Sequence, residues 1–337
     1  MKIAIVKLSA LGDIVHAMVA LQFIKAHSPT IQIDWIVEES FLAILEHNPD
    51  INAIYPVNLK ALKKDKSKFW RELKNIHQIS KNNYDLVIDA QGLIKSAIVA
   101  KLLGKKVAGF NQNSIREKLA AYFYTLKIDC PYHENTIDRN AKILSAPLGF
   151  AISSAQIHAK NTFIFFQNKN KELESYFPPD KKNIIFVIGS TWESRNYPKE
   201  HFLELAEQLK QNCLVVWGNA AEQEKAQWLA HHSQFIQVLP KLDLNDLKMA
   251  ISKADLVIGN DTGPTHLAWG LNIPAIVLFG CTPVRRVYQT AINKVLKSPS
   301  VVNPYKLNKL DFSIAEIKVE QVLALATQLL YASPVVL

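Results

Sequence analysis

Short β-branched segments alternate with helical patterns along most of this 337-residue chain. The pattern predicts strands at Ile3–Leu8, Ile33–Glu38, Ala53–Val57, Leu86–Ala90, Lys106–Phe110, Ile184–Ile188, Leu214–Trp217, Phe235–Leu239, Leu256–Ile258 and Ala275–Phe279. It predicts helices at Ile14–Ala26, Phe69–Ser80, Asp138–Leu148, Lys199–Lys210, Ala221–His231 and Ile314–Tyr331. Such alternation is typical of parallel sheets that carry helices on both faces. We therefore expect an α/β fold of the doubly wound class.

The chain is longer than a single hydrophobic core usually supports, which favours two domains. The polar stretch Gln167–Lys182 is weakly periodic and contains two adjacent prolines, so it is the expected boundary. We expect an N-terminal domain over 1–167 and a C-terminal domain over 178–313. A final helix within 314–337 is expected to pack back on the N-terminal domain.

Composition excludes several classes of protein. Hydrophobic residues make up 49% and charged residues 20% of the chain, which is globular rather than disordered composition. No apolar stretch reaches the roughly 18–20 residues of a membrane-spanning helix. The opening Met1–Lys7 is too short for a signal peptide, so we expect a cytoplasmic strand there. Three widely spaced cysteines favour reduced thiols over disulfides or a zinc site.

Familiar nucleotide-binding fingerprints are also missing. The chain has no Gly-x-Gly-x-x-Gly, no P-loop and no Gly-x-Ser-x-Gly motif, so a dehydrogenase, a P-loop NTPase or a serine hydrolase has no support. It has no Asp-x-Asp pair, so no metal-bridged diphosphate site and no obligatory metal are expected.

Basic residues cluster in the first half of the chain, whose formal net charge is +9 overall. One group is Lys60, Lys63, Lys64, Lys66, Lys68, Arg71, Lys74 and Lys81; a second is Lys95, Lys101, Lys105, Lys106, Arg116 and Lys118. Few acidic residues oppose them. A solvated surface would explain any single lysine, but the clustering favours an anionic partner: nucleic acid, acidic lipid or a phosphorylated substrate.

Two strand–turn–helix junctions carry polar residues. Gly259–His266 follows the apolar run Ala254–Ile258, and Ser9–Asp13 follows the first strand. A helix start offers N–H groups and a positive dipole end to an anion. Ligands of open α/β sheets collect at the carboxyl ends of strands, where both turns are expected. The two turns therefore suggest an enzyme that acts on a nucleotide-activated substrate.

Asp13 has two readings. It can cap the helix that it opens, because aspartate is a preferred capping residue. It can also act as a general base that takes a proton from an attacking hydroxyl. Ser9 and His16 lie close in sequence, and Lys7 is an unexpected charge at the end of a buried-looking strand. This clustering makes the catalytic reading as strong as the structural one.

The second half supplies candidate ligands for an activated donor. In the turn after residue 258, polar groups of Asp261, Thr262, Gly263 and His266 converge, although an ordinary turn with a capping aspartate would look similar. Two earlier strands, Ile184–Ile188 and Leu214–Trp217, are also followed by candidates. Ser190, Thr191 and Arg195 suit phosphate oxygens, and Glu222 suits a ribose. The alternatives are a long polar loop and a carboxylate that only compensates a helix dipole.

Three segments in this order resemble the ADP-heptose-dependent lipopolysaccharide heptosyltransferases, over nearly the whole chain. They are Lys7–His16 (KLSALGDIVH), Asp89–Ser96 (DAQGLIKS) and Asp261–His266 (DTGPTH). The opening segment is more similar to heptosyltransferase I than to heptosyltransferase II. The resemblance implies a GT-B fold, in which two Rossmann-like doubly wound domains face each other across a cleft and the second binds the donor.

The resemblance also implies a reaction and roles for residues. It implies inverting transfer of L-glycero-D-manno-heptose from ADP-heptose to Kdo of Kdo–lipid A, with no cofactor. Asp13 becomes the catalytic base. The donor-binding residues become Ser190, Thr191 and Arg195 at the diphosphate, Glu222 at the ribose, Leu242 at the adenine, and Asp261, Thr262, Gly263 and His266 around the donor. The family more often has Thr at 190, Lys at 195 and Met at 242, and Arg and Lys differ in geometry.

The basic first half then becomes the acceptor side. Candidate acceptor contacts are Lys7, Ser9, His16, Lys63, Lys64, Lys95 and Arg116. The enzyme is expected to be a cytoplasmic monomer at the anionic face of the inner membrane, held peripherally. Rival readings are another sugar-nucleotide enzyme of this fold (heptosyltransferase II or an epimerase) and, less favoured, a nucleic-acid-binding protein, because no aromatic interleaving accompanies the lysines.

Overall fold

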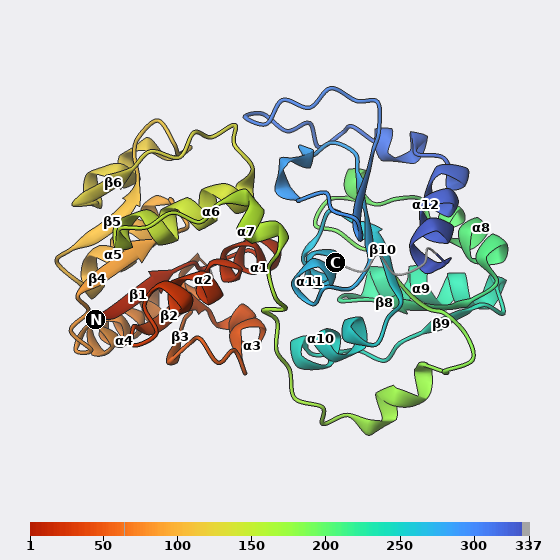
Figure 1. The fold of residues 1–337 in the computed structure, drawn as a ribbon, viewed down its shortest axis with the longest axis horizontal. Coiled ribbons are helices and arrows are strands. Elements are labelled where there is room, and N and C mark those ends of the chain that lie inside the picture. The colour runs from red at the N-terminus through yellow and green to blue at the C-terminus, as the bar shows by residue number, and fades with distance from the viewer. Residues whose placement is uncertain (64, 332–337) are drawn as a thin grey trace. The chain divides into compact units, whose positions relative to one another are not determined.

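The computed structural model describes residues 1–63 and 65–331. The chain divides into two compact units, Met1–Phe165 and Phe166–Leu337. Each unit is built around its own parallel β-sheet of six strands (Figure 1).

The sheet of the first unit has the strand order β3-β2-β1-β4-β5-β6, and every neighbouring pair is parallel. Its strands are β1 (Lys2–Val6), β2 (Gln32–Glu38), β3 (Ala53–Val57), β4 (Leu86–Asp89), β5 (Val107–Phe110) and β6 (Leu126–Ile128). The central strand β1 pairs with β2 through Ile3 and Ile33 and with β4 through Ile3 and Leu86. Its residues from Ile3 to Val6 are fully buried.

Helices form two groups around this sheet. Their bounds are α1 (Leu11–Met18), α2 (Ala20–His27), α3 (Leu42–Leu45), α4 (Phe69–Ser80), α5 (Ile94–Leu103), α6 (Thr136–Ser145) and α7 (Ser154–His158), with 3₁₀ turns η1 (Glu39–Phe41), η2 (Ala61–Lys63), η3 (Lys66–Lys68), η4 (Lys118–Phe123) and η5 (Ala146–Leu148). Helix α6 packs on α1 and α2, whereas α5 packs on α4 and η4. The helix predicted at 14–26 is two helices that meet at Val19.

The sheet of the second unit has the order β12-β11-β10-β7-β8-β9 and is also parallel throughout. Its strands are β7 (Asn183–Val187), β8 (Asn212–Val216), β9 (Ile236–Val238), β10 (Leu256–Asn260), β11 (Ala275–Phe279) and β12 (Asn293–Lys297). Its helices are α8 (Lys199–Leu209), α9 (Ala220–His232), α10 (Leu244–Ser252), α11 (Gly263–Gly270) and α12 (Val319–Tyr331), with η6 (Lys171–Tyr176), η7 (Glu193–Arg195), η8 (Val284–Arg286) and η9 (Ser313–Glu316).

These two sheets confirm the prediction of two doubly wound α/β halves. All ten expected strands are present, within a residue or two of the predicted bounds. The sequence analysis missed β6 and β12, which are edge strands. Both are short and largely polar or exposed, with Lys127 inside one and Lys294 inside the other, so neither shows the apolar run of a buried strand.

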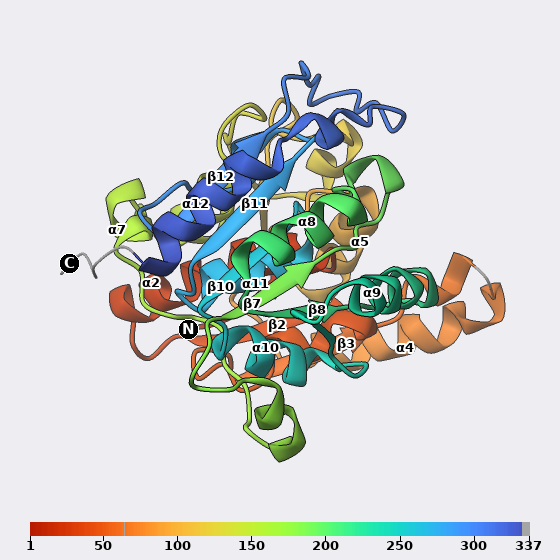
Figure 2. The ribbon, with the colours of Figure 1, turned by 90° about the vertical axis from the view of Figure 1, so that its right-hand side faces the viewer.

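The last helix contributes to a hydrophobic core. Helix α12 belongs to the second unit, where it packs on α8 and on β10, β11 and β12 (Figure 2). Its apolar stripe of Val322, Ala326 and Leu330 is buried in the same core as Phe186 and Ile258. The stripe completes the core of the second unit, and the expected packing of this helix against the N-terminal domain stays a prediction. No helix among the described residues is long and apolar enough to cross a membrane.

Candidate functional site

The predicted base, Asp13, lies in the first turn of α1, the helix that follows β1. Asp13 is the third residue of α1 and is partly exposed. Its Oδ2 accepts a hydrogen bond of 3.3 Å from the backbone N–H of Ala10, the residue just before the helix. The carboxylate therefore does help to close the helix start, as the capping reading expected. That bond uses Oδ2, and the role of Asp13 as a base stays a prediction.

Two candidate acceptor contacts near Asp13 are buried. Lys7 is 6% exposed, and its ammonium donates to the Ala90 carbonyl at 2.7 Å and to Asn140 Oδ1 at 3.2 Å. His16 is 1% exposed on α1. Burial of both side chains does not favour direct contact with an acceptor. Lys7 instead links the end of β1 to the end of β4 and to α6 by these two hydrogen bonds, which accounts for a charged residue at this strand end.

The remaining acceptor candidates are spread over the first unit. Ser9 is partly exposed in the β1–α1 loop, Lys95 is partly exposed in the first turn of α5, and Arg116 is exposed before η4. Lys63 ends η2, and Lys64 lies outside the described residues. Acceptor contact by these residues stays a prediction.

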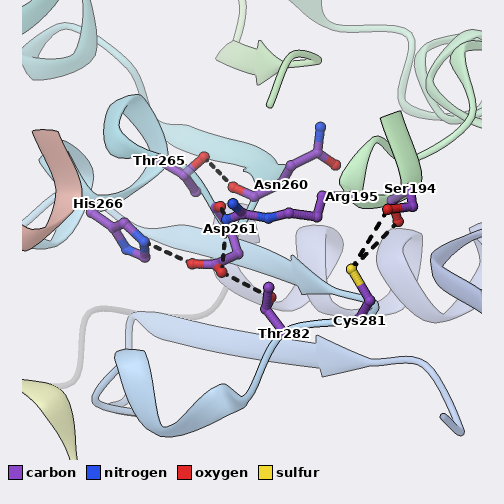
Figure 3. A network of polar contacts seen from close by, with 8 residues as sticks. All are labelled: Ser194, Arg195, Asn260, Asp261, Thr265, His266, Cys281 and Thr282. Atoms are coloured by element: carbon purple, nitrogen blue, oxygen red, sulfur yellow. Dashed lines mark hydrogen bonds and ion pairs between the residues drawn. The ribbon is translucent and has the colours of Figure 1, made fainter. Parts of the chain in front are cut away.

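In the second unit, Asp261 is the centre of a polar network at the end of β10 (Figure 3). Its carboxylate is 1% exposed. Oδ1 lies 3.0 Å from His266 Nε2, while Oδ2 accepts from Thr282 Oγ1 at 2.8 Å and from Arg195 Nη2 at 2.9 Å. Arg195 Nη2 also donates to the Asp261 carbonyl oxygen. We call these four residues the Asp261 network.

The network sets the charge of Asp261. Burial acts to raise the pKa of this carboxyl, but the hydrogen bond from His266 and the positive charges of His266, Arg195 and Arg286 outweigh it and hold the pKa well below its usual range. Asp261 is therefore ionised at neutral pH. Because its carboxylate has these three partners, it holds Arg195 and His266 in place, and a contact between Asp261 and the donor stays a prediction.

Two of the residues predicted to face a diphosphate carry unsatisfied polar atoms. Ser190 Oγ and Arg195 Nε are both buried and have no hydrogen-bond partner among the described residues. Ser190 follows β7, and Arg195 ends η7 in the same loop. A buried polar group without a partner costs roughly 1–3 kcal/mol. Phosphate oxygens would supply the missing acceptor for Arg195 and for the serine hydroxyl.

Glu222 is held at the adjoining strand end. Its Oε2 accepts from the Gly218 N–H at 2.7 Å and its Oε1 from Asn219 Nδ2 at 2.8 Å. Gly189 makes room for it, since a Cβ built there would lie 2.1 Å from Glu222 Cδ. The structure therefore brings Gly189, which follows β7, against the carboxylate predicted to bind a ribose.

Helix α11 adds backbone donors beside this network. Thr262 is its N-cap residue and makes no side-chain capping bond, and Gly263 and Pro264 begin the helix. N–H groups at such a helix start are suited to an anion. Thr191 is exposed after β7, and Leu242 is partly exposed before α10. The roles of these residues stay predictions.

The sequence analysis missed two residues that shape the site. Thr282 follows β11 and completes the shell of Asp261. Asn260 accepts from the Tyr197 N–H at 2.9 Å and donates to the Ile188 carbonyl at 3.0 Å, which joins the ends of β10 and β7. A signal was present, because Asn260 lies two residues and Thr282 three residues beyond the end of a predicted strand. Their contacts, however, lie far apart in the sequence.

Comparison with known proteins gives the class of the chain. Residues 72–308 match Glycosyltransferase family 9 (heptosyltransferase). A curated protein of Campylobacter coli, lipopolysaccharide heptosyltransferase 1, is 38% identical over 98% of this chain and 99% of its own length. The protein of the same name from Escherichia coli K12 is 30% identical over 84% of this chain and 88% of its own length. The chain belongs to glycosyltransferase family 9 and is a glycosyltransferase.

Solved structures agree with this assignment. The structure of E. coli heptosyltransferase WaaC with ADP is similar with a TM-score of 0.81 and 25% identity, over 98% of this chain and all of that one. WaaC with ADP-2-deoxy-2-fluoro heptose gives a TM-score of 0.78, also at 25% identity, over 97% of this chain and 99% of that one. These matches confirm the predicted GT-B fold of two Rossmann-like domains.

Proposed function

We propose that this chain transfers L-glycero-D-manno-heptose from ADP-heptose to Kdo of Kdo–lipid A, with inversion at the anomeric carbon. The observation that carries the proposal is the pair of buried atoms Ser190 Oγ and Arg195 Nε, which have no hydrogen-bond partner in the described part of the chain. Both lie at positions that the resemblance assigns to the diphosphate. The names of the curated relatives and the ligands of the WaaC structures support the choice of ADP-heptose as donor.

The proposed reaction divides the work between the two units. Asp13 takes the proton of the attacking acceptor hydroxyl, and the hydroxyl oxygen forms a bond to the anomeric carbon. The bond from that carbon to the β-phosphate oxygen breaks, and ADP leaves with its electron pair. Arg195 and the N–H groups of α11 stabilise the charge that develops on the departing diphosphate. Glu222 accepts hydrogen bonds from the ribose hydroxyls.

The decisive experiment is a transfer assay with ADP-heptose and Kdo–lipid A in which the product is detected by mass. Asp13→Asn should lower kcat by about 10²–10⁴-fold, the usual contribution of a general base, and leave ADP binding unchanged. Asp138→Asn is the matched control, because Asp138 is also the third residue of a helix in the first unit. Wild-type turnover in Asp13→Asn would show that Asp13 only closes its helix.

Donor specificity separates this proposal from an enzyme that uses a different nucleotide. ADP and ADP-heptose should raise the melting temperature more than UDP at equal concentration. Arg195→Met should raise the KM for ADP-heptose, since it removes the unpartnered Nε. Equal stabilisation by UDP, or an epimerised donor without transfer, would favour the rival sugar-nucleotide enzymes.

We further propose that the enzyme works at an anionic membrane on the cytoplasmic side, and that the α5–η4 surface docks there. This surface comprises the exposed apolar side chains Ile98 and Leu102 of α5 and Leu119 and Tyr122 of η4. Helix α5 and η4 pack against each other, and Tyr122 is 75% exposed. The exposed cations of the same two elements and their flanks are Lys101, Lys105, Arg116 and Lys118.

Charge argues for lipid as the occupant. Glu117 is the acidic residue of this segment, and its Oε2 accepts a hydrogen bond of 2.7 Å from the Ile94 N–H. Exposed apolar side chains together with exposed Lys and Arg in the same elements are typical of a surface that lies in the interface of an anionic bilayer. Each cation near such a surface contributes about 1 kcal/mol.

Sedimentation with vesicles tests the docking surface. Wild-type protein should bind vesicles of phosphatidylethanolamine with phosphatidylglycerol but not vesicles of phosphatidylcholine alone. The double variant Leu119→Ser/Tyr122→Ser should lose most of this binding, while Leu310→Ser, at an 81% exposed position of the second unit, should keep it. Binding that Leu119→Ser/Tyr122→Ser leaves unchanged would refute this surface. Salt-sensitive binding to DNA instead would favour the nucleic-acid reading.

A further inference from the structure

The turn after β4 is fixed by a buried carboxylate. Asp89 is fully buried at the end of the strand. Its Oδ1 accepts from the N–H groups of Gln91 at 2.8 Å and Gly92 at 3.2 Å, and its Oδ2 accepts from Ser96 Oγ at 2.9 Å and Tyr124 Oη at 2.7 Å. Desolvation raises the pKa of Asp89, against these hydrogen bonds. Four donors therefore hold one turn in a single conformation.

The surrounding backbone is shaped to admit this arrangement. A Cβ at Gly109 would lie 2.4 Å from the ring of Tyr124, so the absence of a side chain on β5 lets the tyrosine reach Asp89. Gly92 has a φ of +72°, a conformation that favours glycine, and a Cβ there would lie 2.8 Å from Ile115. The turn can thus aim the side chain of Gln91 in one direction.

That direction is the loop that carries Asp13. Gln91 Oε1 accepts hydrogen bonds from the backbone N–H groups of Leu8 and Ser9, each at 3.1 Å. Because both partners are donors, the amide must present its oxygen here. The next N–H along the chain, that of Ala10, is the one bound by Asp13. Three successive peptide groups are therefore held by two side chains.

We infer that Gln91 is a positioning residue that sets the place of the Asp13 carboxylate through the Leu8–Ser9 backbone. The inference rests on the proposed function, in which Asp13 is the base. It also explains why an amide suits this position. A glutamate would accept the same two N–H bonds but would add a second negative charge within about 10 Å of Asp13, since the two oxygens bind neighbouring residues.

Two substitutions separate geometry from charge. Gln91→Leu removes the acceptor, and we expect kcat to fall about 10–100-fold, as small misplacements of catalytic groups do. The KM for ADP-heptose should change less than twofold, because the proposed donor-binding residues lie in the second unit. Hydrogen exchange at Leu8 and Ser9 should become faster. Gln156→Leu is the matched control, because Gln156 also accepts a backbone N–H, that of Ser153 at 2.9 Å.

Gln91→Glu should keep the hydrogen bonds from the Leu8 and Ser9 N–H groups but add a negative charge. Exchange at Leu8 and Ser9 should stay as slow as in the wild type. The acidic limb of the kcat–pH profile should move up by about half a pH unit, the effect of one nearby charge in a largely solvated setting, with most of the turnover recovered at high pH. The limb reports the charge of residue 91, whereas the exchange rates report whether the Leu8–Ser9 backbone is still held.

Each result decides between defined readings. Wild-type kcat in Gln91→Leu, together with a strong loss in Asp13→Asn, would refute the positioning role and leave the proposed base intact. Full turnover in Asp13→Asn would refute the base itself. If exchange at Leu8 and Ser9 in Gln91→Glu stayed as slow as in the wild type while kcat were as low as in Gln91→Leu at every pH, the backbone position would not set the turnover, and the inference would be overturned.

Discussion

Asp261→Asn tests the Asp261 network most directly, because it removes the negative charge while it keeps the shape of the side chain. In the native protein the carboxylate accepts from Thr282, Arg195 and His266. An asparagine oxygen can still accept from Thr282 and Arg195. Its NH₂ group then faces His266 Nε2, which must become an acceptor.

The loss of stability in Asp261→Asn follows from the positive charge of Arg195, which would be left without its carboxylate partner. Arg195 has a side-chain exposure of 13% and would keep its hydrogen bond to the Asp261 carbonyl, but it would lose its counter-ion. Removing one partner of a buried ion pair costs about 3–5 kcal/mol. We take the lower end, about 3 kcal/mol, because Arg195 is not fully buried. For a unit of this size that corresponds to a fall in melting temperature of roughly 6–12 °C.

Calorimetry across pH measures the effect and its sign. The pKa of Asp261 is lower in the folded protein than in the unfolded chain, where it is about 4. Its contribution to the free energy of unfolding is therefore fully present above about pH 4 and is lost as the pH falls further towards the folded-state pKa. The gap in melting temperature between wild type and Asp261→Asn should be constant from pH 6 to 8 and should shrink below pH 4.

A double-mutant cycle with Arg195→Met supplies the control. If the ion pair carries the cost, Arg195→Met in the Asp261→Asn background should recover part of the lost melting temperature, and the two effects should not be additive. A loss of less than about 1 kcal/mol for Asp261→Asn, or additive effects in the cycle, would refute the view that this pair organises the site.

Two further predictions concern one residue in each unit. Gly189→Ala should weaken ADP binding by about tenfold in titration calorimetry, which corresponds to about 1.4 kcal/mol, because the new Cβ displaces Glu222. Unchanged affinity would show that Glu222 does not bind the ribose. Burial lowers the pKa of Lys160 to about 7, so its charge destabilises the fold fully below pH 7 and less and less towards pH 10. Lys160→Met should therefore raise the melting temperature most near pH 6, with the gain shrinking by pH 10, and a gain independent of pH would contradict this assignment.

The fold was largely predictable because its central strands are buried on both faces. After their first residues, Lys2 and Asn183, strands β1 and β7 consist of apolar residues and stand out as continuous runs. The edge strands β6 and β12 face solvent on one side, so their sequences carry no such run. The placement of α12 was not predictable either, because its apolar stripe would suit either core and only the tertiary packing selects one.

The candidate site was predictable where its residues sit at strand ends. Asp261, Arg195 and His266 were found because parallel strands deliver their carboxyl ends to one edge of the sheet. Thr282 and Gln91 were not assigned roles, because their partners lie 21 and more than 80 residues away. Such contacts depend on strand order, and strand order is not readable from local periodicity.

Arg195 shows how a departure from the family pattern can be accommodated. Its guanidinium has donors on separate nitrogens: Nη2 is bound to Asp261, while Nε is buried and has no hydrogen-bond partner among residues 1–63 and 65–331. A planar group of this kind can keep its ion pair and still donate to a phosphate oxygen, whereas the ammonium of lysine is a single point of charge that must serve both. The arginine therefore preserves the Asp261 network and the proposed diphosphate contact at once, and Thr282, on the same carboxylate oxygen, fixes the orientation in which it does so.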